Sequence, residues 1–340
     1  MYVLTVRNIN HALYSGINLL KYTGQSVAPR GLATIEAPCP VATVYEHPCE
    51  RVLFDERRDA NPFFHFFEAL WILAGRKDVA FLAQFNKKMA DYSDDGDTFH
   101  APYGHRLRHF PTRDGFMDQL DQAIELLSRD HDTRQVVLQI WNAEKDLGAK
   151  TKDLPCNDLI FLKIRHGRLD MRVCCRSNDM IWGAYGANVV QFSMLLEYLA
   201  TMIGVEVGVY TQISDSFHVY TDNEQWKILS EDVRLPHDPY EDNVVVPERL
   251  VTHRDSFDAE LRGVLGALSQ FKWQSISADA GILLKNHIFR DVAFPLFKAW
   301  HRHKETHDGW RELELCPQTD WRLAAVQWLM RHGETNSSNS

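Results

Sequence analysis

Cys156 lies at the start of an apolar run in the stretch KDLPCNDLIF, residues 152–161. Three roles are open to such a cysteine: a nucleophile, a metal ligand or a small core residue. A nucleophilic thiol requires thiolate character, which nearby cations, helix N-termini or hydrogen-bond donors supply. Arg134 and Arg176 would supply positive charge if the neighbouring strands pair. Most single cysteines are small buried hydrophobes, however, so this stretch alone favours a core residue.

A second polar group follows in RSNDMIWGAYGANVVQFS, residues 176–193, between a predicted strand and a predicted buried helix. Arg, Ser and Asn side chains together can bind a phosphate and the edge of a base. A purely structural turn rarely needs so many polar side chains. The segment therefore indicates a ligand site that contains Arg176, Ser177, Asn178, Asp179 and Asn188.

The segment NPFFHFFEALWILAG, residues 61–75, predicts a helix that places Glu68 among apolar residues. Asn61 suits the N-cap, Pro62 the first turn and Gly75 the end of this helix. Two interpretations of Glu68 remain open: an acid at the margin of the helix, or a buried acid. Burial raises the pKa of a carboxyl group and suits it to proton transfer, so a buried Glu68 would be a candidate general acid or base.

The elements around these residues predict an α+β protein with mixed strands and buried helices. FMDQLDQAIELLSRD has helical spacing, and RQVVLQIWN is typical of a strand. NDLIFLKIRHGRLDMRVCCRSND predicts a hairpin that turns at His166 and Gly167, and NVVQFSMLLEYLATMIG predicts a helix that ends at Gly204. EVGVYTQISDSFHVY predicts a further pair of strands.

The domain organisation follows from composition along the chain. Residues 1–240 are predicted to form one catalytic domain. LPHDPYEDNVVVPERL, residues 235–250, is rich in proline and acids and predicts a surface connection. Residues 241–333 are predicted to form a helical region packed on the same domain, and the polar residues 334–340 a flexible tail.

The composition is that of a soluble globular protein: 45% of the 340 residues are hydrophobic and 24% are charged. The formal net charge of −9 argues against a duplex DNA-binding protein, so an anionic substrate needs a few local arginines. The six cysteines include no Cys-x-x-Cys pair, which argues against a metal site or a disulfide scaffold. Without a signal peptide or a long apolar run, a reduced cytoplasmic protein with no membrane partner is expected.

The order of several motifs resembles the thymidylate synthase superfamily, which includes phage and antibiotic-pathway nucleotide hydroxymethylases. PCN is followed by RSND, by a glycine turn with an asparagine and by SDSFHVY, while EALWILAG, APYGHRLR and DTRQVVLQIWN occupy matching places. The resemblance extends from about Arg30 to Tyr220. It implies a thymidylate synthase-like α+β fold, in which a mixed sheet packs against helices and a homodimer forms through the sheet. It also implies a bacterial or phage-infected cell.

The resemblance implies covalent catalysis, in which Cys156 adds to C6 of a pyrimidine nucleotide. C5 then becomes a carbon nucleophile that attacks the methylene carbon of 5,10-methylenetetrahydrofolate. Glu68 would organise water near the 4-substituent of the base, and Tyr103 would help to remove the C5 proton. The remaining family positions would contact the substrate: Asp179 and Asn188 the base, His218 and Tyr220 the sugar 3′-hydroxyl, and Arg30, Arg134, Arg176 and Ser177 the 5′-phosphate.

Two of these arginines have a further implied property. Arg134 would come from the other subunit of the homodimer. Arg176 would lower the pKa of Cys156 in addition to binding the phosphate. The resemblance also implies that Ser177 suits a substrate whose sugar is deoxyribose.

Departures from the family pattern bear on the base that is used. Asn157 stands where thymidylate synthases have a histidine after the nucleophile. Asn188 reaches its family position only through a one-residue insertion; otherwise Ala187 takes that place. An amide can donate to O4 and accept from N3–H of uracil, so Asn188 favours dUMP. Asp158 or a water could instead favour dCMP.

Further departures bear on the product. The polar tail GETNSSNS, and Tyr92 in place of a tryptophan, would let water reach the intermediate. The predicted reaction is therefore folate-dependent C5 hydroxymethylation of dUMP, or of dCMP. Other hypotheses remain: a thymidylate synthase that makes dTMP, and a catalytically silent nucleotide- or RNA-binding regulator. A thiol hydrolase using Cys156 and His218 is chemically feasible but leaves the RSND group unexplained.

Overall fold

The computed structural model describes residues 1–270, 283–314 and 316–333. Its centre is a mixed eight-stranded sheet in the order β1-β4-β10-β9-β8-β7, with β3 paired to β10 and β2 paired to β3. The sheet strands are β1 Tyr2–Val6, β2 Gln25–Val27, β3 Thr34–Glu36, β4 Val41–Tyr45, β7 Val137–Gln139, β8 Asn157–Arg165, β9 Arg168–Asp179 and β10 Glu206–Tyr220. A separate hairpin consists of β5 Phe110–Thr112 and β6 Gly115–Met117.

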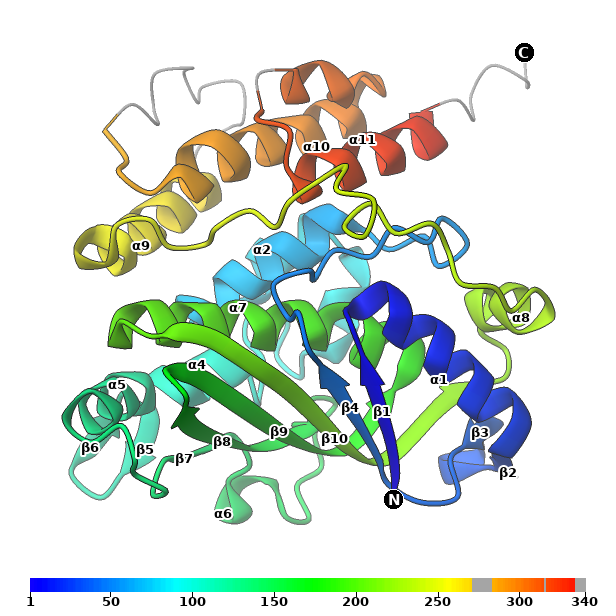
Figure 1. Cartoon of the computed structure of the whole chain (residues 1–340), viewed down its shortest axis with the longest axis horizontal. Helices are drawn as coiled ribbons and strands as arrows, with labels where there is room; N and C mark the ends of the chain where they lie inside the picture. The colour runs from blue at the N-terminus through cyan, green and yellow to red at the C-terminus, as the bar shows by residue number, and fades with distance from the viewer. Residues whose placement is uncertain (271–282, 315, 334–340) are drawn as a thin grey trace.

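Helices cover one face of the sheet in layers (Figure 1). α1 and α7 lie on the sheet, α2 packs against α7, and α9, α10 and α11 form the outermost layer. The α-helices are α1 Ile9–Thr23, α2 Pro62–Leu73, α3 Val79–Ala83, α4 Tyr103–Arg108, α5 Gln119–Arg129, α6 Ala143–Asp146, α7 Asn188–Ile203, α8 Glu224–Glu231, α9 Arg254–Gln270, α10 Phe294–Thr306 and α11 Asp320–Gly333. Other helical turns are η1 Pro29–Gly31, η2 Lys87–Tyr92, η3 Met180–Ala187, η6 Ile288–Ala293 and η7 Gly309–Leu313. Within the described ranges, no helix is long and apolar enough to cross a bilayer.

Local sequence signals fix the ends of the helices that carry the site. Asn61 caps α2 by accepting a hydrogen bond from the Phe64 amide at 3.0 Å, and Pro62 lies in the first turn. Gly75 follows the end of α2 with φ +67, and Gly204 ends α7 with φ +89, the left-handed conformation that glycine adopts most easily. The helices predicted from these two segments are confirmed, and α5 confirms the third.

The predicted hairpin is confirmed by β8 and β9, which pair antiparallel. Its turn residues His166 and Gly167 have φ of +52 and +72. Because side chains alternate along a strand, Cys175 is buried whereas Cys174 is half-exposed on the opposite face. The strand predicted in RQVVLQIWN is shorter than expected, since only β7 is extended and paired.

The strand pair predicted for residues 206–220 is wrong, because these residues form one strand, β10, of 15 residues. β10 pairs in parallel with β9 on one side and antiparallel with β4 and β3 on the other. No residue within this strand has the positive φ of a hairpin turn. Parallel neighbours require a long crossover instead, and α7 provides it between β9 and β10.

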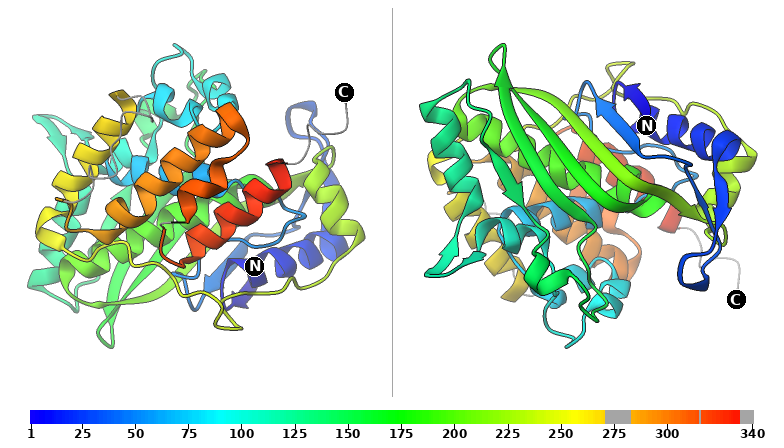
Figure 2. Two further views of the ribbon diagram at one scale, coloured as in Figure 1. Left: turned by 90° about the horizontal axis from the view of Figure 1, so that it is seen from above. Right: turned by 90° about the horizontal axis from the view of Figure 1, so that it is seen from below.

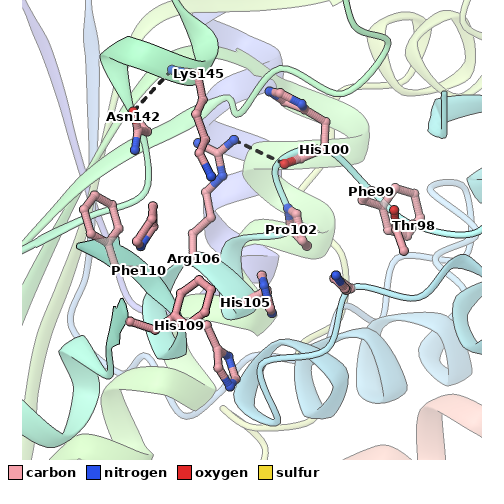
Figure 3. Close-up of a pocket in the computed structure, with 13 residues that line it drawn as sticks. Thr98, Phe99, His100, Pro102, His105, Arg106, His109, Phe110, Asn142 and Lys145 are labelled. Atoms are coloured by element: carbon pink, nitrogen blue, oxygen red, sulfur yellow. Dashed lines mark hydrogen bonds between the residues drawn. The ribbon is translucent and has the colours of Figure 1, made fainter. Parts of the chain in front are cut away.

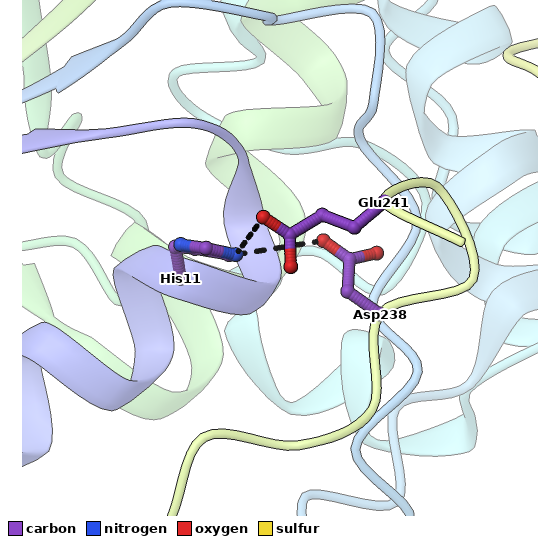
Figure 4. Close-up of side chains that lie close together, drawn as sticks. All are labelled: His11, Asp238 and Glu241. Carbon is purple, nitrogen blue, oxygen red and sulfur yellow. Dashed lines mark ion pairs between the residues drawn. The ribbon is translucent and has the colours of Figure 1, made fainter. Parts of the chain in front are cut away.

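The surface connection predicted for residues 235–250 is exposed in part but anchored at its centre. Asp238 is 3% exposed and accepts a hydrogen bond from the Asn8 side chain at 2.7 Å. Nε2 of His11 lies 3.3 Å from Glu241 Oε1 and 3.8 Å from Asp238 Oδ2 (Figure 4). These contacts fix the segment to the start of α1, before the chain enters the C-terminal helices.

The C-terminal helices pack on α2 through aromatic rings. Trp300 of α10 lies 5.4 Å from Phe63, and Trp321 of α11 lies 5.1 Å from Phe66, measured between ring centroids. The first unit and the helices after residue 254 therefore share buried aromatic surface. Residues 334–340, predicted as a flexible tail, lie outside the described residues.

Among the described residues, no helix covers the middle of β8, β9 and β10 on the other face of the sheet (Figure 2, right). Side chains that point to this face are half-exposed and include Leu159, Phe161 and Ile213. Leu159, Cys174 and Ile213 form an apolar row across the three strands, and a mixed row of Phe161, Arg172 and Thr211 lies beside it.

Candidate active site

β8 and β9 bring the cysteine motif and the arginine motif together. Their register places Asn157 opposite Cys175, and the Arg176 amide donates to the Cys156 carbonyl at 3.0 Å. Nη2 of Arg176 lies 3.8 Å from Cys156 Sγ. The guanidinium is held in place because its Nε donates to the Pro155 carbonyl at 2.8 Å. The two side chains expected to cooperate are thus in contact.

Opposing effects set the pKa of Cys156. Burial has the largest effect and raises the pKa of this thiol, and the carboxylates of Asp153 and Asp158 also raise it. The positive charges of Arg176 and Arg30 lower it. The balance lies above the ordinary value, so the free protein holds a protonated thiol at neutral pH. The expected lowering by Arg176 is present, but burial outweighs it.

Tyr103, the first residue of α4, faces Cys156 and Asn157. Burial raises the pKa of Tyr103 well above its usual range, and the neighbouring Cys156 raises it further. The buried Asn157 amide is hydrogen-bonded to the Tyr103 hydroxyl, and its Oδ1 accepts from the Cys175 thiol at 2.8 Å. Asn157, which stands in place of a histidine, therefore connects the Tyr103 hydroxyl to the buried Cys175 thiol through hydrogen bonds.

A π-type turn accommodates the extra residue before Asn188. η3 follows β9 and has π-helical hydrogen bonding, which takes up one residue more than an α-helical turn. Nδ2 of Asn188 donates to Asn178 Oδ1 at 3.1 Å, and its Oδ1 accepts from Asn157 Nδ2 at 3.5 Å. The wider turn thus delivers Asn188, and not Ala187, to the polar cluster.

Glu68 is a buried acid, 8% exposed, and not an acid at the margin of α2. Burial raises its pKa to about 7, and the hydrogen bond that Gln191 Nε2 donates to Glu68 Oε2 at 2.7 Å lowers it. A carboxyl group with a pKa near neutrality can both give and take a proton. The motifs do not identify Gln191, although its position three residues after Asn188 puts both on one face of α7.

β9 and β10 place the expected sugar and base contacts side by side. In their parallel register Ser177 lies next to Ser216, and Asp179 lies next to His218. The rings of His218 and Tyr220 are 5.5 Å apart, so both side chains lie on one side of β10, as the alternation predicts. Burial is the largest cause that raises the pKa of Tyr220, and the charge of Asp179 adds to it.

Asp179 has one satisfied and one free carboxylate oxygen. Oδ1 caps η3 by accepting from the Trp182 amide at 2.6 Å. Oδ2 is buried and has no hydrogen-bond partner within the described part of the chain. Burial raises the pKa of this carboxyl group. An N–H or O–H group of a ligand would satisfy Oδ2.

The three arginines expected at the phosphate do not all lie together. Arg30 lies in η1, where its charge lowers the pKa of both Cys156 and Tyr220. Among the described residues, no hydrogen bond or ion pair joins Arg134 to this cluster. Arg134 is instead exposed in a surface hollow with Asp130, Asp132, Thr133 and Gln135.

Two exposed aromatic rings lie near this cluster. Tyr92 of η2 is 54% exposed and lies close enough to Tyr220 to affect its pKa. Trp182 of η3, which the motifs do not identify, is 53% exposed. Arg58 lies 4.9 Å from the Trp182 ring and donates to the Ile181 carbonyl, which fixes the start of η3. Flat rings beside buried polar groups suit the pteridine and aminobenzoyl rings of a folate.

Known proteins align with most of this chain. The thymidylate synthase family model matches residues 63–242. A deoxyuridylate hydroxymethyltransferase of Pseudomonas phage M6 is 41% identical over 352 residues, which cover 97% of this chain and 94% of that protein. A protein of the same name from Bacillus phage SP01 is 48% identical over 62% of this chain and 56% of its own length. A putative thymidylate synthase of Methanosarcina barkeri is 28% identical over 68% of this chain and 94% of its own. The chain belongs to the thymidylate synthase family.

Proposed function

We propose that this protein transfers a one-carbon unit from 5,10-methylenetetrahydrofolate to C5 of dUMP and releases the 5-hydroxymethyl nucleotide. The observation that carries the proposal is the contact between Arg176 and the Cys156 sulfur, in a site that also holds a buried acid and a fixed amide. The name of the phage M6 relative, which aligns with 97% of this chain, supports the same reaction.

Cys156 begins the reaction by adding to C6 of the base, which turns C5 into a carbon nucleophile. The thiol must lose its proton for this step, and Arg176 stabilises the thiolate that results. C5 then bonds to the one-carbon unit that the folate supplies, and Tyr103 assists the loss of the C5 proton. Glu68, with its pKa of about 7, exchanges protons with water beside the 4-oxygen. Loss of the C5 proton expels tetrahydrofolate from the one-carbon unit, and water then adds to that carbon as hydroxide and gives up its proton. Departure of the thiolate from C6 restores the C5–C6 double bond and the free Cys156.

The amide of Asn188 favours uracil over cytosine. Its bonds to Asn178 and Asn157 use one N–H and one oxygen lone pair, which leaves one donor and one acceptor for a ligand. Uracil offers the complementary pair, the O4 acceptor and the N3–H donor. In the described chain no hydrogen bond joins Asp158 to this amide group. dUMP is therefore the proposed substrate, and dCMP is the competitor to be tested.

The open aromatic surface supports a hydroxymethyl product. Tyr92 and Trp182 are 54% and 53% exposed, so the described part of the chain seals neither ring. Water that enters such a site captures the one-carbon unit before hydride transfer can reduce it to a methyl group.

A homodimer formed through the uncovered face of the sheet would complete the phosphate site. Arg134 lies apart from Cys156 within one chain, and the face near Leu159 and Phe161 is half-exposed. A second copy docked there would contribute its own Arg134 to the phosphate bound beside Arg176. Isologous contacts of this kind are the commonest basis of protein dimers.

The test incubates the purified protein with 5,10-methylenetetrahydrofolate and either dUMP or dCMP, and determines the product mass by mass spectrometry. We expect dUMP to gain the mass of CH2O. A gain of CH2 alone would contradict hydroxymethylation and indicate synthesis of dTMP, and a product only from dCMP would overturn the choice of base. Release of tritium from C5-labelled nucleotide distinguishes an enzyme from a silent binding protein.

A further inference from the structure

A cavity outside the Cys156 site lies between α4, the loop before it, the β5–β6 hairpin and α6 (Figure 3). Its volume is about 180 Å3. Of the residues that the structure describes, no acidic one lines it, and none of the lining residues belongs to the polar cluster around Cys156. Its basic lining residues are Lys77, His100, His105, Arg106, His109 and Lys145.

The positive charge of the cavity is only partly neutralised. Arg106 forms a bidentate ion pair with the fully buried carboxylate of Asp146, which also contacts His100 at 3.0 Å. Lys77 and Lys145 have no carboxylate partner in the part of the chain that the structure describes. Two lysine charges therefore face the cavity without a counter-ion.

Two histidines border the same place. The rings of His105 and His109 are stacked with their centroids 4.8 Å apart. Nδ1 of His105 donates to the Gly75 carbonyl at 3.1 Å, so Nε2 donates to an anion only when the ring is charged. Burial lowers the pKa of His105, and the nearby charges of His109, Lys77 and Lys145 lower it further. The neighbouring charges thus oppose a positive charge on His105, and an anion bound here would relieve that repulsion.

An aromatic ring borders this charge. Phe116 of β6 is 73% exposed, although it lines the cavity. Phe110 of β5, which also lines the cavity, is half-buried. An exposed ring beside a positively charged groove is the combination that binds a nucleotide, because the ring stacks on the base while the cations hold the phosphates.

We propose that this cavity binds the phosphate groups of a nucleoside polyphosphate, with the base stacked on Phe116. The size of the cavity agrees with phosphate groups inside it and a base outside it. A cavity of about 150 Å3 holds a molecule the size of benzene, so 180 Å3 admits phosphate groups but not a whole nucleotide. The base must then lie outside, where the exposed ring is.

The experiment titrates the full-length protein with dATP and with pyrophosphate at low salt, using isothermal calorimetry. dATP is chosen because its purine cannot serve as a substrate for addition at a pyrimidine C6. The double variant Lys77→Ala/Lys145→Ala should bind dATP at least tenfold more weakly than the parent. Phe116→Ala should weaken dATP at least threefold and leave pyrophosphate unchanged.

The matched control is Lys150→Ala/Lys227→Ala, which removes the same charge from exposed lysines outside the cavity. It should bind dATP like the parent protein, and Lys77→Arg/Lys145→Arg should restore binding to the cavity variant. Equal affinities of the cavity variant and the control, or no binding to the parent, would overturn the proposal. Pyrophosphate binding as tight as that of dATP, with no effect of Phe116→Ala, would overturn the nucleotide assignment.

Discussion

The reactivity of Cys156 depends on the balance between burial and the charge of Arg176 at its sulfur atom. Serine has a similar size but lacks the easily ionised thiol. We expect Cys156→Ser to lower kcat by roughly 10⁴-fold or more, while the Kd for dUMP changes little, because the phosphate contacts remain. Steady-state assays and calorimetric titration measure the two quantities. Cys39→Ser, at another half-buried cysteine, is the control and should behave like the parent protein.

Glu68 should give the enzyme a pH dependence near neutrality. Burial raises its pKa to about 7, and the Gln191 hydrogen bond lowers it by favouring the ionised form. Gln191→Met removes that bond at similar volume, so the pKa must rise. A hydrogen bond to a charged group contributes about 1.5 kcal/mol, which corresponds to about one pH unit.

The measurement is the pH profile of kcat from about pH 5 to pH 9. The inflection near pH 7 should move to higher pH in Gln191→Met and disappear in Glu68→Gln. An inflection that stays in place in Gln191→Met would assign it to a different group.

The sequence predicts the site residues whose order along the chain is distinctive and misses those that depend on packing. Cys156 and Arg176 belong to motifs, and the hairpin between them makes their contact predictable. Gln191 and Trp182 become visible only when α7 and η3 are placed against α2 and the sheet. The net pKa of Cys156 also depends on burial, which local sequence does not specify.

At the scale of elements, the close packing of α4 on α2 positions Tyr103. A Cβ atom added to Gly104 would lie 1.9 Å from the Ile72 carbonyl oxygen, so Gly104→Ala must push the two helices apart. We expect a loss of about 3 kcal/mol in the free energy of unfolding, as for overpacked cores, together with a lower kcat. Chemical denaturation and steady-state assays measure both.

Gly263→Ala is the matched control for that substitution. Gly263 is exposed in α9, and an added Cβ would meet nothing within 4 Å. Because alanine favours a helix over glycine, this variant should gain about 0.5 to 1 kcal/mol and keep its kcat. Unchanged stability in Gly104→Ala would mean that α4 can move without loss, contrary to the packing.

Elements with local signals are the ones that the sequence predicts correctly. α2 has its cap, its proline and its glycine, and the β8–β9 hairpin has its turn residues. The alternation of apolar and polar residues does not distinguish β10 from a pair of strands, because one long strand and two short ones show the same pattern. The π-type turn of η3 has no local signal either, and only the requirement for Asn188 in the site indicates the extra residue.

At the scale of the whole molecule, the C-terminal helices are the part whose position the sequence leaves open. Their apolar residues predict helices, but many surfaces could receive them. The partners prove to be the phenylalanines of α2, Phe63 and Phe66. The face of α2 that carries these two rings is therefore covered by residues more than 200 positions away in the chain, whereas Glu68 contacts Gln191 of α7.

The arrangement of Arg134 predicts that two chains share each active site. Arg134→Ala and Cys156→Ser should each inactivate a homodimer, but a heterodimer of the two variants contains one site with both residues intact. We expect purified heterodimers, separated by two affinity tags, to recover about half of the parent kcat per dimer, since one of two symmetric sites is complete.

The control is the heterodimer of Arg176→Ala and Cys156→Ser. Arg176 contacts Cys156 within one chain, at 3.8 Å, so each site of this heterodimer keeps a defect and no recovery is expected. Recovery in the first pair but not in the second would show that Arg134 acts across the interface while Arg176 acts within its own chain. If the heterodimer of Arg134→Ala and Cys156→Ser is as inactive as the two homodimers, Arg134 does not act in the partner's site. The proposed dimer through the uncovered sheet face would then lose its main support.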